Sequence, residues 1–229
     1  MVAFSSRQDL DFSPIGEKPP KSLLASVSFA VDDEKAMKQW LKIHDWPFTE
    51  IYGPVFSTGP HKYLSVLDPE GHQLYFVWAL RETHSGPLSL IHAGWVVKDC
   101  AAMDKFYKDI LGFHLYWHGG MEDGDTDWVD MQVPDGTDWI EYMLNVDPHA
   151  DKRELGVMNH IALGVPDVRA AANQLEQAGV KLSEPPTIGR DGKWQLNLYD
   201  PDFTTVELME FSPVEKPCCS EYTGPHPKP

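Results

Sequence analysis

An internal repeat with a period of about 66 residues constrains the fold of this chain more than any other feature. Three apolar runs typical of strands open the copies: LLASVSFAV (23–31), LIHAGWVV (90–97) and VMNHIALGV (157–165). An acidic helix start follows each run directly, and the candidate last strands, aligned on Tyr75, Glu141 and Glu207, lie 66 and 66 residues apart. Because self-similarity at a fixed period indicates repeated structural units, the sequence predicts three copies of one small unit.

Each copy has the element order βαβββ. The helical segments carry apolar residues at the 3.6-residue period, as in Met103, Phe106, Tyr107 and Ile110, and Gly112 then ends the second helix. Three strand-like runs follow, and a turn precedes the last: DPEG (68–71), PDG (134–136) and DPDF (200–203). The predicted fold class is therefore α+β, with three tandem βαβββ modules, two of which pair into an open barrel around a shared cleft.

The repeat also divides the chain into segments. We expect an N-terminal extension (1–22), a first module (23–87), a second module (88–146), a polar linker (147–156), a third module (157–212) and a C-terminal tail (213–229).

The charge balance excludes several kinds of partner. Acidic residues outnumber basic ones by 35 to 19, which gives a net charge of −16 and argues against nucleic acid and anionic membranes. No apolar run approaches the roughly 18 residues that span a bilayer. The N-terminus MVAFSSRQDL has no apolar signal core, so we expect a cytoplasmic protein that acts on a small molecule.

The three cysteines do not form a disulfide framework, because their number is odd and Cys218 and Cys219 are adjacent. The tail KPCCSEYTGPHPKP is interpreted as a proline-rich end, ordered or frayed, without chemistry. A thiol or metal-capturing tail is the alternative.

Strand periodicity places two histidines and two glutamates in the cleft. Because alternate residues of a strand share a face, His92 and His160 point away from the apolar face that packs on the helix. By the same rule Glu141 and Glu207 turn into the cleft. The small residues beside the histidines, Gly94, Ala162 and Gly164, are expected to leave room for a ligand there.

A carboxylate within an apolar strand is costly to bury unless it is paired or bound to a metal. Two such carboxylates at symmetric positions, each with a symmetric histidine, predict a metal site. Imidazole and carboxylate ligands suit one divalent transition metal, Ni, Zn, Fe, Mn or Co.

These motifs resemble those of the vicinal oxygen chelate superfamily, which includes glyoxalase I, methylmalonyl-CoA epimerase, extradiol dioxygenases and fosfomycin-resistance proteins. The resemblance covers about residues 23–212 and is carried by LIHAGW, MNHIAL, YDPDFTTVEL and WIEYML. In that family one ligand comes from the first strand of a module and one from its last. The resemblance therefore implies that the metal ligands are His92, Glu141, His160 and Glu207.

The first module departs from this pattern, since Ser26 and Tyr75 stand at the two ligand positions. It is therefore expected to be structural. Modules of this family form pairs, and the first module has no partner in its own chain. Pairing with the first module of a second chain would cover its exposed sheet. This arrangement suggests a homodimer.

The four-ligand set resembles glyoxalase I and the epimerases, whose shared chemistry is proton abstraction next to a carbonyl. The resemblance implies a metal-dependent lyase or isomerase with Glu141 or Glu207 as the base. An extradiol dioxygenase is the first alternative, although Asn197 stands where that family has a tyrosine, three residues before the aspartate of the turn. A non-catalytic binder of small molecules is the second alternative.

Several other residues are candidates for the cleft. Trp139, and Trp128 or Trp194, are expected to line it and to favour an aromatic or apolar substrate. His114 and His118 share a strand face and are expected at the rim or in water. The turn 189–193 is expected to be a solvated loop, with its basic groups as an alternative clamp for a carboxylate.

Overall fold

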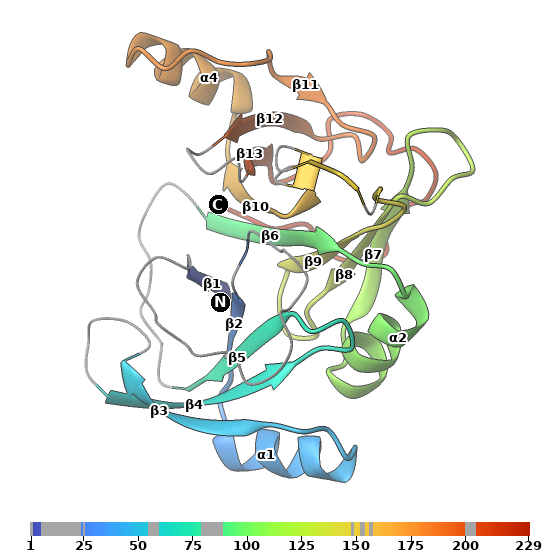
Figure 1. Cartoon of the computed structure of the whole chain (residues 1–229). Helices are drawn as coiled ribbons and strands as arrows, with labels where there is room; N and C mark the ends of the chain where they lie inside the picture. The colour runs from blue at the N-terminus through green and yellow to red at the C-terminus, as the bar shows by residue number, and fades with distance from the viewer. Residues whose placement is uncertain are drawn as a thin grey trace.

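The computed structural model describes residues 2–5, 24, 26–54, 60–78, 89–147, 149–151, 154–155, 158–199 and 205–229. Within them the strands form a five-stranded and an eight-stranded sheet (Figure 1). The predicted turn DPDF and most of the N-terminal extension lie outside the described residues.

Three βαβββ units succeed one another, as predicted. The first contains β2 (Ser26–Ala30), α1 (Glu34–Ile43), β3 (Thr49–Pro54), β4 (Pro60–Leu67) and β5 (Gln73–Val77). The second contains β6 (Ser89–Val96), α2 (Cys100–Asp104), η1 (Lys105–Ile110), β7 (His114–Gly119), β8 (Trp128–Gln132) and β9 (Trp139–Met143). The third contains β10 (His160–Val165), α4 (Val168–Gln177), β11 (Thr187–Ile188), β12 (Trp194–Tyr199) and β13 (Thr205–Glu210).

All three units have the same strand order. The first strand pairs in parallel with the last, and the two middle strands lie further outward, as in β6-β9-β8-β7. The repeat and the α+β class predicted from the sequence are therefore confirmed, whereas the residue boundaries between segments stay predictions.

Aspartates begin the helices and glycines end two of them. The side chains of Asp33, Asp99 and Asp167 each accept a hydrogen bond from the backbone amide three residues later, which caps a helix N-terminus. Gly112 and Gly179 follow the second and third helices with φ of +80° and +87°, a conformation that glycine adopts without steric cost.

The second helix departs from regular α geometry. After α2 the chain continues as the π-helical turn η1, although the sequence predicts a uniform helix. The predicted apolar side is still buried, since Met103, Phe106 and Tyr107 are fully enclosed. A single π turn changes the hydrogen-bond spacing and leaves the apolar face directed at the core.

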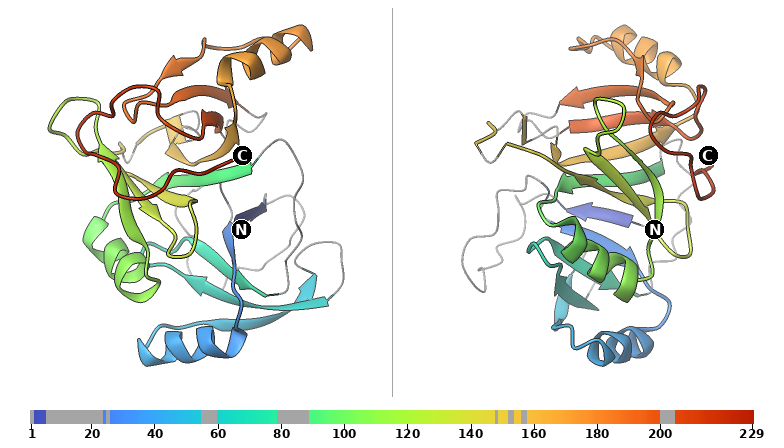
Figure 2. Two further views of the ribbon diagram at one scale, coloured as in Figure 1. Left: turned by 180° about the vertical axis from the view of Figure 1, so that it is seen from behind. Right: turned by 90° about the vertical axis from the view of Figure 1, so that its right-hand side faces the viewer.

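The two modules that carry the predicted ligands share the eight-stranded sheet. Their first strands, β6 and β10, pair antiparallel, and the strands of both modules curl into a half-barrel (Figure 2). In the first module β1 (Val2–Ser5) pairs antiparallel with β2, in the place that β10 takes beside β6.

One core joins the first and second modules. It contains Val27, Leu64 and Phe76 from the first module and Trp95 and Phe106 from the second.

Polar contacts from the DPEG turn support this junction. Tyr107 donates from its hydroxyl to the Asp68 carboxylate at 3.1 Å, and the His72 ring stacks on Trp95 with 4.4 Å between ring centroids. The first module therefore supports the strand that carries His92.

The C-terminal tail is ordered and crosses β7 and β8. Thr223 donates its amide to the Tyr116 carbonyl at 3.0 Å, and Gln132 donates to the Pro225 carbonyl at 2.9 Å. Cys218 and Cys219 form a disulfide. In the part of the chain that the structure describes, no helix is long and apolar enough to cross a membrane.

Candidate metal centre

Strand register brings the four predicted ligands to one place. In the second module Glu141 of β9 lies opposite Gly94 of β6, two residues after His92. In the third module Glu207 of β13 lies opposite Ala162, two residues after His160. The two ligand pairs therefore occupy equivalent positions in their modules.

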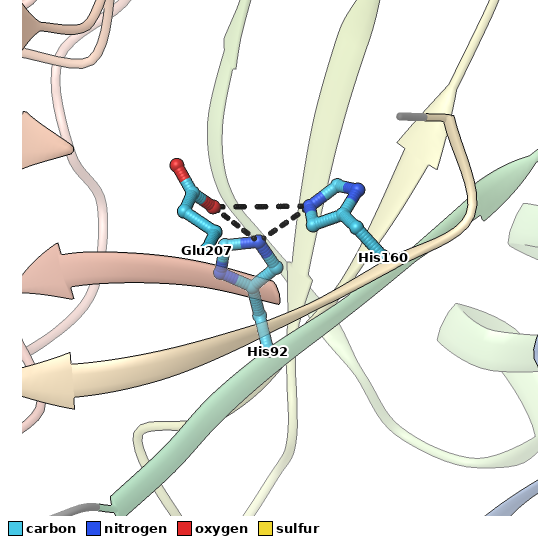
Figure 3. A group of neighbouring side chains, drawn as sticks. All are labelled: His92, His160 and Glu207. Carbon is cyan, nitrogen blue, oxygen red and sulfur yellow. Dashed lines mark hydrogen bonds and ion pairs between the residues drawn. The ribbon is translucent and has the colours of Figure 1, made fainter. Parts of the chain in front are cut away.

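The antiparallel pairing of β6 with β10 then joins the two pairs. His160 lies opposite Gly94, and Ala162 lies opposite His92, so the imidazoles are diagonal neighbours on the cleft side of the half-barrel. Figure 3 shows His92, His160 and Glu207 converging from three neighbouring strands.

The ligand atoms lie close together. The two histidine Nε2 atoms are 2.9 Å apart, and Glu207 Oε2 lies 3.3 Å from Nε2 of His92 and 3.9 Å from that of His160. Glu141 Oε2 lies 3.0 Å from His160 Nε2 and 3.6 Å from His92 Nε2. The potential ligand atoms of His92, His160 and Glu207 all lie within 4.8 Å of one another.

These separations, from 2.9 to 3.9 Å, are close to those of ligands that share an ion. Two ligands about 2.1 Å from one metal lie roughly 3.0–3.4 Å apart at angles between 90° and the tetrahedral value. The group is buried, with side-chain exposures of 1% for His92, 7% for His160, 9% for Glu207 and 14% for Glu141. A set of two imidazoles and two carboxylates suits a divalent transition metal rather than calcium or magnesium, which prefer oxygen ligands.

Burial shifts the pKa values of the histidine and of both glutamates, and a cation would reverse the shift of the two carboxyl groups. Burial, aided by the nearby His160 and Lys193, holds the pKa of His92 well below its usual range, so this imidazole is neutral. Burial and then the charge of Glu207 raise the pKa of Glu141 well above its usual range. Burial also raises the pKa of Glu207. A metal ion would favour both carboxylates in their charged form.

Trp139 supports His92 from the side. The two rings stack with 4.7 Å between centroids, and His92 Nδ1 has no hydrogen-bond partner among the described residues. Packing against Trp139 therefore helps to orient this imidazole, whose Nε2 faces that of His160.

The two glycines beside the histidines, Gly94 and Gly164, make room for side chains and not for a ligand, which corrects the sequence prediction for these two positions. A Cβ atom on Gly94 would lie 2.2 Å from Cε1 of His160, and one on Gly164 would lie 2.3 Å from the Phe211 ring. The ring of His160 lies over Gly94, so the glycine positions a candidate ligand.

The ligand group opens into a cleft of about 160 Å³. Three indole rings line it, from Trp117, Trp128 and Trp139, together with Asn197 and Arg190. The expectation for Trp139 and Trp128 is therefore confirmed, and Trp117 is an addition that the sequence did not single out.

Trp194 lies elsewhere. It lines a larger, open hollow of about 490 Å³ beside α4, where the Arg169 guanidinium lies 4.8 Å from its ring centroid. His114 contacts the Gln132 side chain, and neither His114 nor His118 lines the cleft.

Lys193 is fully buried beneath the site, so the prediction of a solvated loop is wrong. Its Nζ lies 4.4 Å from the ring centroid of Trp139, 5.3 Å from that of Tyr116 and 5.2 Å from that of Tyr222. Asp191 Oδ2 lies 4.0 Å from this nitrogen. An ammonium group among aromatic faces is held by cation–π attraction. Burial lowers the pKa of Lys193, and the surrounding carboxylates oppose that shift.

Two further carboxyl groups line the cleft. Asp130 of β8 lies opposite Glu141 in register and is buried, and burial followed by the charge of Glu141 raises its pKa well above the usual range. Burial raises the pKa of Asp191 to about 6, and Tyr222 from the tail donates its hydroxyl to the Asp191 carbonyl at 2.8 Å. In the sequence Asp130 stands between two apolar residues, Val129 and Met131. This pattern could have indicated that its carboxyl group is buried.

The fold and this donor set define the vicinal oxygen chelate class. The family model of the Glyoxalase/Bleomycin resistance protein/Dioxygenase superfamily matches residues 89–208, more than half of the chain. The protein belongs to this superfamily, whose members include metal-dependent enzymes.

Solved structures show the same fold at low sequence identity. The 2,3-dioxygenase LapB from Pseudomonas sp. KL28 superposes with a TM-score of 0.63 and 17% identity, covering 90% of this chain and 74% of LapB. The Mn(II)-bound glyoxalase from Novosphingobium aromaticivorans gives 0.58 and 15%, covering 82% of this chain and 62% of the glyoxalase. No functionally curated protein matches the sequence significantly.

Proposed function

We propose that the protein is a glyoxalase-I-like, metal-dependent lyase or isomerase that abstracts a proton next to a carbonyl of a small oxygen-chelating substrate. The observation that carries this proposal is the position of Glu141, a second carboxylate 3.0 Å from His160 at the place where a three-ligand site would be open. A carboxylate beside the other donors can bind the metal and, when released, act as a base.

His92, Glu141, His160 and Glu207 would hold the ion, which we propose to be Ni, Zn, Fe, Mn or Co. When bound, it supplies Lewis-acid stabilisation of the oxygen charge that develops as the proton leaves. The neutral imidazole of His92, stacked on Trp139, is already in the protonation state that a ligand requires.

We assign the base to Glu141. Its side chain is more exposed to the cleft than that of Glu207, 14% against 9%. Glu141 would take the proton from the substrate carbon and return it to the neighbouring atom. The three indoles of the cleft would hold an aromatic or otherwise apolar body of the substrate.

The two glutamates provide the test. Metal content is measured for the wild type and for Glu141→Gln and Glu207→Gln, and a panel of α-hydroxy ketones and hemithioacetals is incubated in D₂O to follow deuterium incorporation by NMR. Glu207→Gln should lose the metal, whereas Glu141→Gln should keep most of it and lose exchange by about 10²–10⁴-fold. Unchanged exchange in Glu141→Gln would contradict the assignment.

An extradiol-type dioxygenase is the second candidate. It is favoured by the compact group of two histidines and Glu207, which is the donor set of many non-haem iron oxygenases. Oxygen uptake by Fe(II)-loaded protein with a panel of catechols distinguishes the two candidates. A non-catalytic binder, the third, would purify without metal and bind aromatic ligands nonetheless.

We also propose a homodimer, because the first module has no second module to pair with in its own chain. β1 covers the edge of β2 that a partner module would use, so the dimer contact would form at the outer edge of β1. Equilibrium sedimentation at micromolar concentration should give a mass near twice 25.9 kDa, and a monomer would refute this proposal.

A further inference from the structure

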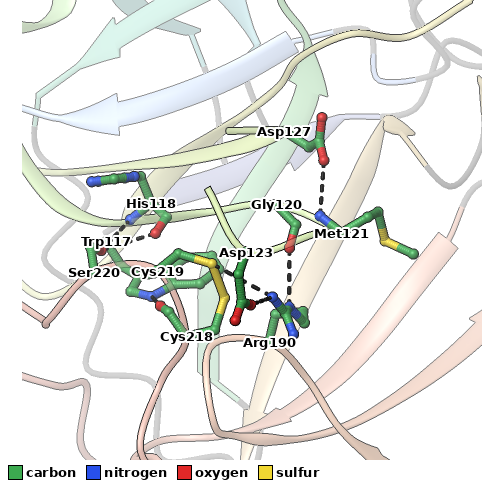
Figure 4. Close-up of a disulfide and its surroundings, with 10 residues drawn as sticks. All are labelled: Trp117, His118, Gly120, Met121, Asp123, Asp127, Arg190, Cys218, Cys219 and Ser220. Atoms are coloured by element: carbon green, nitrogen blue, oxygen red, sulfur yellow. Dashed lines mark hydrogen bonds and ion pairs between the residues drawn. A yellow bond between two sulfur atoms is a disulfide. The ribbon is translucent and has the colours of Figure 1, made fainter. Parts of the chain in front are cut away.

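The disulfide between Cys218 and Cys219 lies at the rim of the cleft (Figure 4). Two residues that line the cleft, Trp117 and Arg190, contact the two cysteines. Trp117 donates its indole N–H to the Cys218 carbonyl at 3.2 Å, and the Cys218 amide donates to the Arg190 carbonyl at 2.8 Å. Arg190 Nη2 lies 3.8 Å from Cys219 Sγ.

Arg190 connects this pair of cysteines to the loop between β7 and β8. Its Nε donates to the Gly120 carbonyl at 3.1 Å, and its Nη2 forms an ion pair with Asp123. Figure 4 shows the guanidinium between the loop and the disulfide. The tail, the turn at Arg190 and the loop 120–127 therefore form one rim, and the disulfide lies on the tail side of it.

A soluble reductant can reach this disulfide. Cys219 is exposed and Cys218 is half-buried, whereas disulfides that serve only to hold a core are enclosed. Exposed disulfides are the ones that exchange readily with thiols. Closing a ring between adjacent residues also constrains very little of the unfolded chain, so stabilisation of the fold does not account for this bond.

The backbone at Cys219 has a left-handed conformation. Its φ is +68°, a value that residues other than glycine rarely adopt. Once the two sulfurs separate, Cys219 is free to return to an ordinary conformation, and the contact of its sulfur with Arg190 would be lost.

We propose that the Cys218–Cys219 disulfide is a redox-active modification site that controls the rim of the cleft. A dithiol reductant attacks the exposed Cys219 sulfur, and a mixed disulfide forms as the bond to Cys218 breaks. The second thiol of the reductant then displaces Cys219, so that both cysteines become thiols and the reductant becomes a disulfide. The reduced tail releases Trp117 and Arg190, and the cleft opens.

Thiol counting and hydrogen exchange test this proposal without a metal. The purified protein is labelled with a maleimide before and after reduction with a phosphine, and amide exchange is followed by mass spectrometry. One cysteine, Cys100, should label before reduction and three after it. The segments 118–125 and 189–192 should then exchange about fivefold faster, as expected for the loss of one net hydrogen bond.

Two variants provide the controls. Cys218→Ser/Cys219→Ser should show the fast exchange with or without reductant, and Cys100→Ser should respond as the wild type does. Exchange in β10 should stay unchanged throughout. Three reactive thiols before reduction, or unchanged exchange at both segments after it, would overturn the proposal, and neither result depends on the metal or the reaction.

Discussion

The first and second modules share an architecture and differ at the site. In the first module Ser28 of β2 lies opposite Tyr75 of β5, and in the second Gly94 of β6 lies opposite Glu141 of β9. The register is the same in both, and Ser26 stands where the second module has His92. Helix caps, strand order and turns are retained in the first module without any of the predicted ligands.

This difference separates the residues that specify the fold from those that specify the site. Val27 and Leu74 of the first module occupy the positions of Ala93 and Ile140 of the second. All four side chains are buried in the hydrophobic core. Two side chains per module on the opposite face distinguish the modules with predicted ligands from the first module. The face opposite the helix can therefore change its chemistry while the core stays intact.

Ligand removal should give the largest effect that distinguishes the two modules. His92→Ala should reduce metal content from about one ion per chain to near zero, and activity should be lost with it. Ser26→Ala at the equivalent position should leave both unchanged. Elemental analysis of the purified variants measures the first quantity directly.

Stability gives a second readout of the same comparison. A ligand present at 100 times its Kd stabilises the folded state by about 2.7 kcal/mol. Removing the metal with a chelator should therefore destabilise the wild type and Ser26→Ala by roughly that amount, and should leave His92→Ala unaffected. Chelation that destabilises His92→Ala equally would place the ion elsewhere.

A methyl group at Gly94 should give the next largest effect. It would meet the His160 ring at 2.2 Å, so the imidazole must turn away from its partners. We expect Gly94→Ala to weaken metal binding by about 10–100-fold, the range seen when the residues that orient a ligand are changed. Ser28→Ala at the equivalent position should not affect metal binding. Titration calorimetry with Mn²⁺ or Zn²⁺ checks both, and equal affinities for Gly94→Ala and wild type would contradict the assigned role.

The pH dependence of stability should give the smallest effect. Burial raises the pKa of Asp191 to about 6, so the folded state binds its proton more tightly than the unfolded state. The stability that this carboxyl contributes is present below about pH 4 and is lost as the pH rises through 6. Over that window the loss is roughly 3 kcal/mol.

Urea unfolding of chelated protein at pH 4 and pH 7 measures this contribution. Asp191→Asn should flatten the profile, and Asp138→Asn should do so by a similar amount, because burial raises the pKa of both carboxyl groups to about 6. An identical profile in wild type and Asp191→Asn would show that the buried charge of the cleft does not govern acid behaviour.

Periodicity accounts for the features that could be predicted from the sequence. The repeat, the helix caps and the placement of His92, Glu141, His160 and Glu207 on one side of the sheet all depend on strand alternation and on the spacing between modules. The structure brings these four side chains together, since the register of adjacent strands repeats with the modules.

Features that depend on contacts between distant segments could not be predicted in this way. Gly94 is small because a ring from another strand lies over it, and Lys193 is buried because Tyr222, 29 residues further along the chain, covers it. A turn sequence such as GRDGK is polar, and polarity alone predicts exposure. The disulfide position at the cleft likewise depends on where the tail crosses β7.

The stacking of His72 on Trp95 and the hydrogen bond from Tyr107 to Asp68 join the first module to the second. Through these contacts the first module stabilises the strand that carries His92. A shortened chain that kept only the two ligand-bearing repeats would expose an indole and a phenol ring to water and let that strand fray. The repeat that lacks the predicted ligands thus limits the movement of the strand that carries one of them.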